Sequence, residues 1–191
     1  MSESLPERGI IRKMWSVEAS RYREHLLRLD PVSRRNRFGG DVSDEFLAEY
    51  AALATSIDTV IHGFFVNGTM RGAAELRAIG VPIAHEAEAA FSIEEPWQSH
   101  GVGSALLART LLAARNRGIT FLHMACLADN ERMQQLAGKF DAELRFDFGS
   151  VVGELAAPHP APISVAPEIV ADSHGFATAL LDVQARLLRP A

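Results

Sequence analysis

The sequence predicts an α/β (α+β) domain built on a mixed, mostly antiparallel central sheet of six to seven strands flanked by helices. Three observations carry this prediction. Within residues 59–79, two apolar runs flank Asn67-Gly68, the dipeptide typical of a two-residue β-hairpin. Residues 85–93 then alternate apolar and polar side chains, as a half-buried strand does. A glycine loop follows, and from Gly103 the apolar residues recur at helical spacing.

The remaining elements are predicted from local signals. A first strand is expected over residues 10–14, and Ser16 is expected to cap a helix that Asp30-Pro31 ends. Residues 31–41 should form a loop, and Ser43 should cap a second helix that reaches about residue 54. After the glycine loop we expect a helix over 103–117, a strand over 121–126, a helix over 130–139 and one or two closing strands within 142–155.

The chain is expected to divide at about residue 157. Residues 1–157 contain every predicted strand and form one domain, whereas residues 158–191 comprise a proline-rich linker and a C-terminal amphipathic helix over 172–188. The apolar stripe of this helix consists of Phe176, Leu180, Val183 and Leu187. The stripe would pack on its own domain or reach a second copy of the chain in a homodimer.

Composition narrows the classes of function. Hydrophobic residues make up 48% of the chain, enough to bury a core, and the formal net charge of -5 argues against nucleic-acid binding. The single cysteine, Cys126, excludes an internal disulfide and a cysteine-rich metal site, so no metal is expected. The N-terminus lacks the apolar core of a signal peptide, and no apolar stretch is long enough for a membrane span. We therefore expect a cytoplasmic protein without a membrane partner.

The glycine loop, residues 98–104, lies between a predicted strand and a predicted helix. The first turn of a helix has backbone N–H groups without partners, and glycine removes the Cβ atoms that would keep a ligand away from them. The loop is therefore interpreted as a phosphate or pyrophosphate site. No Gly-Lys-Ser/Thr triplet of a Walker loop is present, and Leu106 stands where a dinucleotide fingerprint has its third glycine.

At these residues the sequence resembles the GNAT superfamily of acyl-CoA-dependent N-acetyltransferases. The run from Gln98 to Gly103 matches the family's Gln/Arg-x-x-Gly-x-Gly/Ala loop, and "AEAAFSI" before it looks like the family's fourth strand. Asn130 stands where the family has an asparagine after its fifth strand, and the element order agrees over about residues 10–148. The stretches "VSRRNRFGG" and "NERMQQLA" are similar to the GNAT domains of bacterial Pat-type protein-lysine acetyltransferases.

The resemblance implies that the protein binds acetyl-CoA as acyl donor and transfers the acetyl group to a primary amine by direct attack. The amine would belong to a small molecule or to a protein lysine. The pantetheine arm would lie along the backbone of residues 91–93, where an N–H would polarise the thioester carbonyl. The implied acetyl-CoA-binding residues are Phe91, Ser92, Ile93, Gln98, Ser99, His100, Gly101, Val102, Gly103, Ser104 and Asn130.

For the general base, Glu88 matches the fourth-strand glutamate of relatives of lysine acetyltransferases, and Glu86 on the same face is the second candidate. The sequence departs from the family at Ala137, where many relatives have a tyrosine that protonates the CoA thiolate. This departure leaves an alternative open, a non-catalytic acyl-CoA-binding sensor or interaction module on the same fold.

Several of these residues also have a purely structural explanation. Glu88 could equally be a solvated carboxylate on an open sheet face, and His123 fits a hydrogen-bonded core histidine better than a catalyst. Arg34, Arg35 and Arg37 could meet an acidic group on the acceptor, but solvation of the loop, with Arg37 paired locally, explains them more simply.

Overall fold

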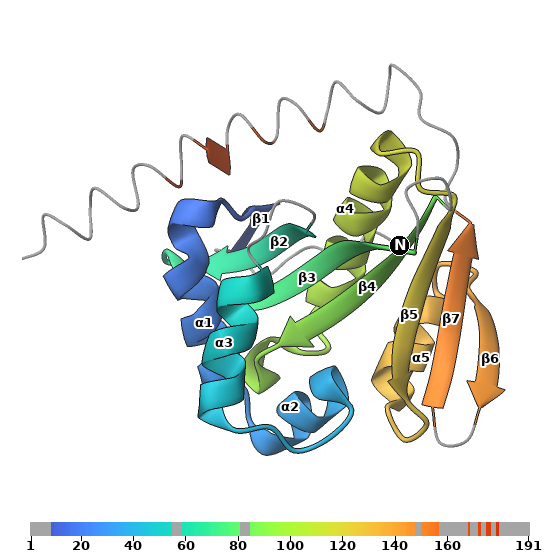
Figure 1. Cartoon of the computed structure of the whole chain (residues 1–191), viewed down its shortest axis with the longest axis horizontal. Helices are drawn as coiled ribbons and strands as arrows, with labels where there is room; N and C mark the ends of the chain where they lie inside the picture. Colours follow the sequence, from blue (N-terminus) through green and yellow to red (C-terminus); the bar gives the residue numbers. More distant parts are fainter. Residues whose placement is uncertain are drawn as a thin grey trace, which may run out of the picture.

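One seven-stranded sheet runs through the computed structural model, which describes residues 9–54, 59–80, 85–147 and 150–156 and five isolated positions beyond them. The strand order is β1-β2-β3-β4-β5-β7-β6 (Figure 1). The strands are β1 (Gly9–Lys13), β2 (Thr59–Val66), β3 (Thr69–Ile79), β4 (Glu86–Ile93), β5 (Phe121–Leu127), β6 (Glu143–Asp147) and β7 (Ser150–Ala156). All neighbouring strands pair antiparallel except β4 and β5, which are parallel. The predicted mixed, mostly antiparallel sheet is confirmed.

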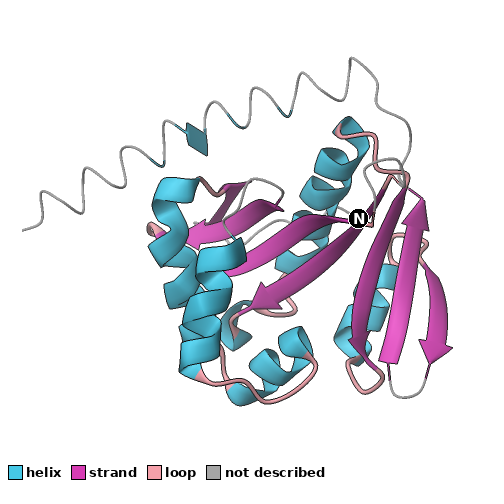
Figure 2. Ribbon diagram, in the orientation of Figure 1, coloured by secondary structure: helices cyan, strands magenta, loops and turns pink. Residues whose placement is uncertain are grey.

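Helices cover both faces of this sheet (Figure 2). They are α1 (Ala19–Arg28), α2 (Pro31–Phe38), α3 (Asp44–Ala54), α4 (Val102–Asn116) and α5 (Glu131–Gly138). On one face, Tyr22 and Leu26 of α1 and Leu47 of α3 are fully buried. On the other, Leu107 of α4 packs with Leu122 of β5. Burying each such side chain contributes about 1.5–3 kcal/mol, so the two helical layers are firmly fixed on the sheet.

The hairpin between β2 and β3 turns at the predicted dipeptide. Asn67 and Gly68 have φ angles of 50° and 74°, the left-handed region that a two-residue hairpin turn requires. The side chain of Ser43 also acts as predicted, because its Oγ accepts a hydrogen bond from the N–H of Phe46 at the start of α3.

Two expectations about the N-terminal helices are wrong. Residues 31–38 form α2 instead of a loop, because Asp30 caps this helix by accepting a hydrogen bond from the Ser33 N–H at 3.0 Å, with Pro31 in its first turn. Ser16 is not an N-cap. It begins a short 3-10 turn, Ser16–Glu18, in which the Glu18 carboxylate accepts from the backbone N–H of Trp15.

The ladder between β4 and β5 is short, and this positions the site. It pairs Glu86 with Phe121, Ala87 with Leu122 and Glu88 with His123, and it ends there. Beyond the third pair the two strands diverge, as Figure 1 shows toward the bottom of the view. The sheet therefore opens between β4 and β5 on the side of their C-terminal ends.

The described positions near the C-terminus pack on the domain of the same chain. These positions, all helical, are Glu168, Asp172, Gly175, Phe176 and Ala179. Arg117, the residue after α4, donates to the Glu168 carboxylate at 2.8 Å, and the Phe176 ring meets Trp15 edge-on with centroids 5.1 Å apart. Phe176 is the only described member of the predicted apolar stripe. Leu180, Val183 and Leu187 lie outside the described residues, and the boundary at residue 157 stays a prediction.

Candidate active site

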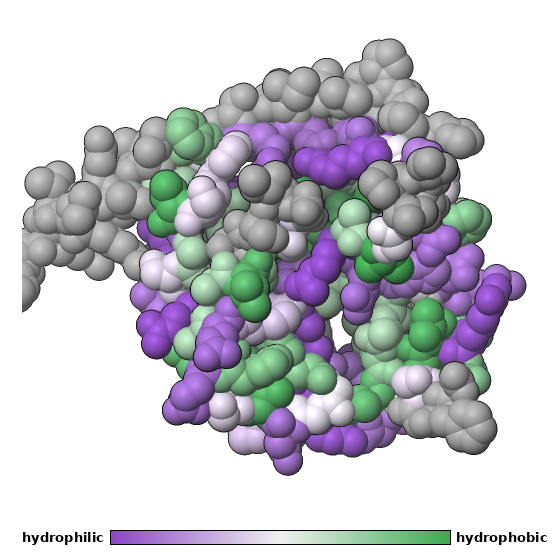
Figure 3. Space-filling model, in the orientation of Figure 1, coloured by the Kyte–Doolittle hydropathy of each residue, from purple (hydrophilic) through white to green (hydrophobic). Residues whose placement is uncertain are grey.

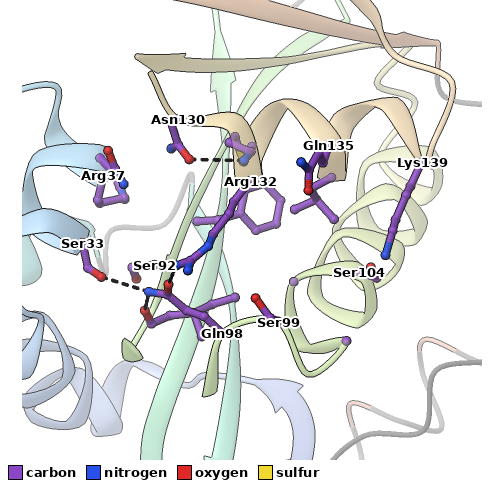
Figure 4. Close-up of a pocket in the computed structure, with 17 residues that line it drawn as sticks. Ser33, Arg37, Ser92, Gln98, Ser99, Ser104, Asn130, Arg132, Gln135 and Lys139 are labelled. Carbon is purple, nitrogen blue, oxygen red and sulfur yellow. Dashed lines mark hydrogen bonds between the residues drawn. The ribbon is translucent and has the colours of Figure 1, made fainter. Parts of the chain in front are cut away.

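A cavity of about 320 Å³ lies where β4 and β5 part. Figure 3 shows the molecular surface hollowed between the two halves of the sheet. The cavity is lined by Ser33, Asn36, Arg37, Phe91, Ser92, Ile93, Gln98, Ser99, Gly101, Gly103, Ser104, Asn130, Arg132, Met133, Gln135, Leu136 and Lys139. The end of β4, the glycine loop, the first turn of α4, α5 and α2 thus meet around one space (Figure 4).

The glycine loop has the backbone geometry of an anion cradle. Gly101 is the N-cap of α4 with a φ of 75°, a conformation that side-chain-bearing residues rarely adopt. At Gly103, an added Cβ would lie 3.4 Å from Leu136 and 3.5 Å from Ile93, two side chains of the cavity wall. The two glycines therefore keep the N-terminal amides of α4 open toward the cavity, where the helix macrodipole favours negative charge.

Gln98 fixes this loop to three other elements. Its Nε2 donates to the Ile93 carbonyl at 2.8 Å and to the Ser33 hydroxyl at 2.9 Å, while Arg132 donates to its Oε1 (Figure 4). The side chain thus connects the loop with β4, α2 and α5. Its amide groups are occupied by these contacts, so Gln98 shapes the cavity wall.

Asn130 positions α5 along the other wall. It is the N-cap of α5, and its Oδ1 accepts from the Met133 N–H at 3.2 Å. This start places Arg132 over the loop, and in Figure 4 the Lys139 ammonium extends toward the turn of α4 that carries Ser104. The sequence analysis missed Arg132 and Lys139, although the predicted helix over 130–139 already contained both.

Most of the predicted donor-site residues gather here. The predicted residues that line the cavity are Phe91, Ser92, Ile93, Gln98, Ser99, Gly101, Gly103, Ser104 and Asn130. Two others lie elsewhere: His100 is exposed with its Nδ1 within 2.5 Å of the Gln98 carbonyl oxygen, and Val102 is buried in the core beside Leu106. His100 and Val102 contribute to the loop through their backbone positions.

The candidate base Glu88 is not among the residues that line the cavity. It is exposed on β4 at the last pair of the β4–β5 ladder, opposite His123. The second candidate, Glu86, is engaged with His123, whose Nε2 lies 3.1 Å from the Glu86 Oε2. Ala137 is buried on the side of α5 that packs against Gly153, so no side chain at this position serves the cavity.

Arg37 reaches the cavity from α2 but is paired locally. It donates to the carboxylate of Glu75 on β3 and to the hydroxyl of Tyr50, and the Tyr22 hydroxyl donates to the same carboxylate. Burial, together with the negative charge of Glu75, raises the pKa of Tyr22 well above its usual range. This buried cluster ties α1, α2 and α3 to the sheet beside the cavity.

Arg34 and Arg35 are held in the same way by neighbouring carboxylates. Arg34 pairs with Asp44 at 2.7 Å, and Arg35 pairs with Asp129 at 2.8 Å. Within the described ranges, no group of three His, Cys, Asp or Glu side chains could hold a metal ion. No helix in the described part of the chain is long and apolar enough to cross a membrane.

Comparison with known proteins identifies relatives of this chain. The model of the acetyltransferase (GNAT) family matches residues 23–141. Acetyltransferase Pat of Mycolicibacterium smegmatis is 28% identical over 85 residues, which are 44% of this chain and 26% of that protein, so the match spans about a quarter of the curated relative.

Two solved structures share the fold. The crystal structure of the GNAT domain of S. lividans PAT is 24% identical with a TM-score of 0.68, covering 76% of this chain and 89% of that one. The structure of yncA from Salmonella typhimurium, solved with its cofactor acetyl-CoA, is 16% identical with a TM-score of 0.60, covering 82% and 98%. At these identities the two structures establish a common fold with the present chain.

Proposed function

The chain belongs to the acetyltransferase (GNAT) family, and from this premise we propose that it transfers an acetyl group from acetyl-CoA to a primary amine. That it is an acyltransferase follows from the family. The donor, the acceptor and the roles of individual residues form the proposal. The observation that carries it is a single cavity lined both by the glycine loop and by the end of β4, where the sheet opens.

Three features of the cavity support acetyl-CoA as the donor. The pyrophosphate is anionic, and the loop offers it the N-terminal amides of α4 without Cβ atoms at residues 101 and 103. Arg132 and Lys139 add positive charge at the same wall. The backbone of Phe91–Ile93, which has no β5 partner at this level of the ladder, is available to the amide groups of the pantetheine arm.

In this proposal, Glu88 prepares the amine for attack. An alkyl ammonium has a pKa of about 10.4 and must lose a proton before its nitrogen can attack the thioester carbonyl. Glu88 is exposed at the inner end of the opening between the strands, where a carboxylate can take this proton directly or through water. Glu86 is a weaker candidate because His123 engages it.

Binding is the first test. Calorimetric titration with acetyl-CoA should show saturable binding, and titration with NADH, an anionic dinucleotide, should show none. The absence of acetyl-CoA binding at millimolar concentration would refute the donor assignment. Binding of both ligands would instead indicate a general nucleotide site.

Release of CoA thiol is the second test, and it also identifies the acceptor. A lysine-containing peptide, spermidine and free amino acids are compared as acceptors, since a peptide-specific rate indicates a protein lysine and a spermidine-specific rate a small amine. Binding without thiol release in the presence of every amine would favour the non-catalytic module.

The third test concerns the base. Glu88→Gln should lower kcat about 100-fold or more while leaving the affinity for acetyl-CoA unchanged, because it removes a proton acceptor without altering the cavity. Glu86→Gln should retain more activity, and Glu143→Gln, an exposed glutamate on β6, is the matched control. Equal rates in Glu88→Gln and Glu143→Gln would eliminate Glu88 as the base.

A further inference from the structure

Three side chains form a hydrogen-bonded array that ends in the cavity. The Ser92 hydroxyl of β4 lies 2.9 Å from the Nε2 of His25, and the Nδ1 of His25 lies 3.2 Å from the Oε1 of Glu94. Ser92 lines the cavity, as Figure 4 shows, while His25 on α1 is completely buried. A hydroxyl, an imidazole bonded to it and a carboxylate that orients the imidazole are the arrangement typical of assisted proton transfer.

The surroundings of the array define where its protons lie. Although burial opposes ionisation of Glu94, hydrogen bonds from His25 and Arg71 lower the pKa of this carboxyl to about 2. Burial lowers the pKa of His25 below its usual value, so the resting imidazole is neutral. An ionised carboxylate only accepts hydrogen bonds, so Nδ1 of His25 carries the proton and Nε2 accepts from Ser92.

The remaining charged groups around His25 are two arginines that bind Glu94. Arg28 on α1 donates to the Glu94 Oε1 at 2.9 Å, and Arg71 on β3 donates to the Oε2 at 2.8 Å. The Tyr22 ring stacks near His25 with centroids 6.5 Å apart. Two guanidinium groups hold the carboxylate in place, so the array is rigid at its buried end and ends at Ser92 in the cavity.

We propose, on the basis of the proposed function, that Ser92 is a catalytic proton carrier. Positioned by His25 and Glu94, it moves a proton from the attacking amine to the departing sulfur of CoA. The chemistry requires such a transfer, because the nitrogen gains a positive charge on attack and the sulfur leaves as a thiolate. Ala137 provides no proton donor for that sulfur, and Ser92 is the hydroxyl in the cavity wall with a buried imidazole behind it.

The proton balance closes without another reactant. Glu88 first takes one proton from the ammonium. When the amine nitrogen bonds to the carbonyl carbon, a second proton passes from nitrogen to the Ser92 Oγ while the Ser92 proton passes to Nε2 of His25. Glu94 stabilises the imidazolium that forms. As the carbon–sulfur bond breaks, sulfur takes a proton from Ser92 and Ser92 recovers one from His25. This leaves an amide, CoA thiol and a proton on Glu88, which Glu88 returns to water before the next turnover.

The test uses the full chain and hydroxylamine as acceptor, since its nitrogen is uncharged at neutral pH and needs no prior deprotonation. Release of CoA thiol above the uncatalysed rate is measured for the wild type, Ser92→Ala, His25→Gln and Glu88→Gln. Thr110→Val is the matched control, because it removes a fully buried hydroxyl on α4 that bonds only the Leu106 carbonyl. Melting temperature and the KM for acetyl-CoA are measured for each variant.

We expect Ser92→Ala and His25→Gln to lower kcat about 100-fold or more with unchanged KM, both with hydroxylamine and with the best alkyl amine. The loss in Glu88→Gln should be smaller with hydroxylamine than with the alkyl amine. Rates of Ser92→Ala and His25→Gln equal to that of Thr110→Val would show that the array only holds α1 on the sheet and would overturn the proposal.

Two further outcomes would overturn either the role of Ser92 or the proposed function. An acetyl adduct on Ser92, detected by mass spectrometry after incubation with acetyl-CoA, would replace the proton carrier with a covalent intermediate and so overturn the proposal. A wild-type protein that binds acetyl-CoA but releases no thiol with any amine would refute the proposed function itself, which distinguishes the two failures.

Discussion

Replacing Glu94 by glutamine tests how much the buried carboxylate contributes to stability. Glu94 is only 6% exposed, and it accepts hydrogen bonds from Arg28, Arg71 and His25. Its pKa of about 2, against a usual value of 4.5, corresponds to about 3 kcal/mol, since each pKa unit is worth about 1.4 kcal/mol. Glu94→Gln removes the charge at nearly constant volume, so the variant should be less stable by about this amount at neutral pH.

The sign of the pH dependence follows from the lowered pKa. The carboxylate stabilises the fold fully above pH 4.5, its pKa in the unfolded chain, and the effect is lost as the pH falls toward its folded value of about 2. Urea unfolding of both proteins should therefore show a difference of about 3 kcal/mol at neutral pH that falls to about half near pH 3. Glu95→Gln, the same change at an exposed neighbour, is the control. A difference that stays constant over this range, or a Glu94→Gln variant as stable as Glu95→Gln, would refute the reasoning.

Three other features give predictions of their own. Gly68→Ala should destabilise the protein by about 1 kcal/mol in urea unfolding because Gly68 has a φ of 74°, whereas Gly40→Ala, at an open site without a positive φ, should not. Cys126 is buried, which raises the pKa of its thiol, so its reaction with a disulfide reagent should be far slower in the native protein than in urea; equal rates would contradict its burial. Arg37→Met should cost about 3 kcal/mol by leaving the buried Glu75 carboxylate with only the exposed Arg77, 3.6 Å away, as a cationic partner, and a melting temperature equal to that of the wild type would disprove this role.

Local sequence signals predicted most of the elements correctly. The hairpin at Asn67-Gly68 and the helix after the glycine loop were predictable because turn chemistry and apolar periodicity act over a few residues. The same reasoning missed α2, since Asp30-Pro31 was interpreted only as the end of one helix. An aspartate followed by proline is equally the start of a helix, and here it does both.

The buried array could not be predicted in this way. Ser92 and Glu94 are 67 and 69 positions from His25, and only the packing of α1 on the sheet brings them together. The glycine loop, in contrast, was predictable as one wall of the cavity, because its backbone geometry depends on consecutive residues. Arg132 and Lys139 join it only through the placement of α5, which Asn130 begins at the end of β5.

Because only three residue pairs join β4 and β5, the sheet consists of two parts, β1–β4 and β5–β7, connected by one short ladder. Beyond this ladder, β4 and β5 each have an edge that no described strand pairs with. Unpaired strand edges are the parts of a sheet that exchange amide hydrogens fastest and aggregate most readily. A ligand that bridges the edges binds the folded chain and not the unfolded one, so its concentration sets how much of the protein is folded. In this architecture, the concentration of the acyl donor would affect both the rate of the reaction and the fraction of the enzyme that stays folded.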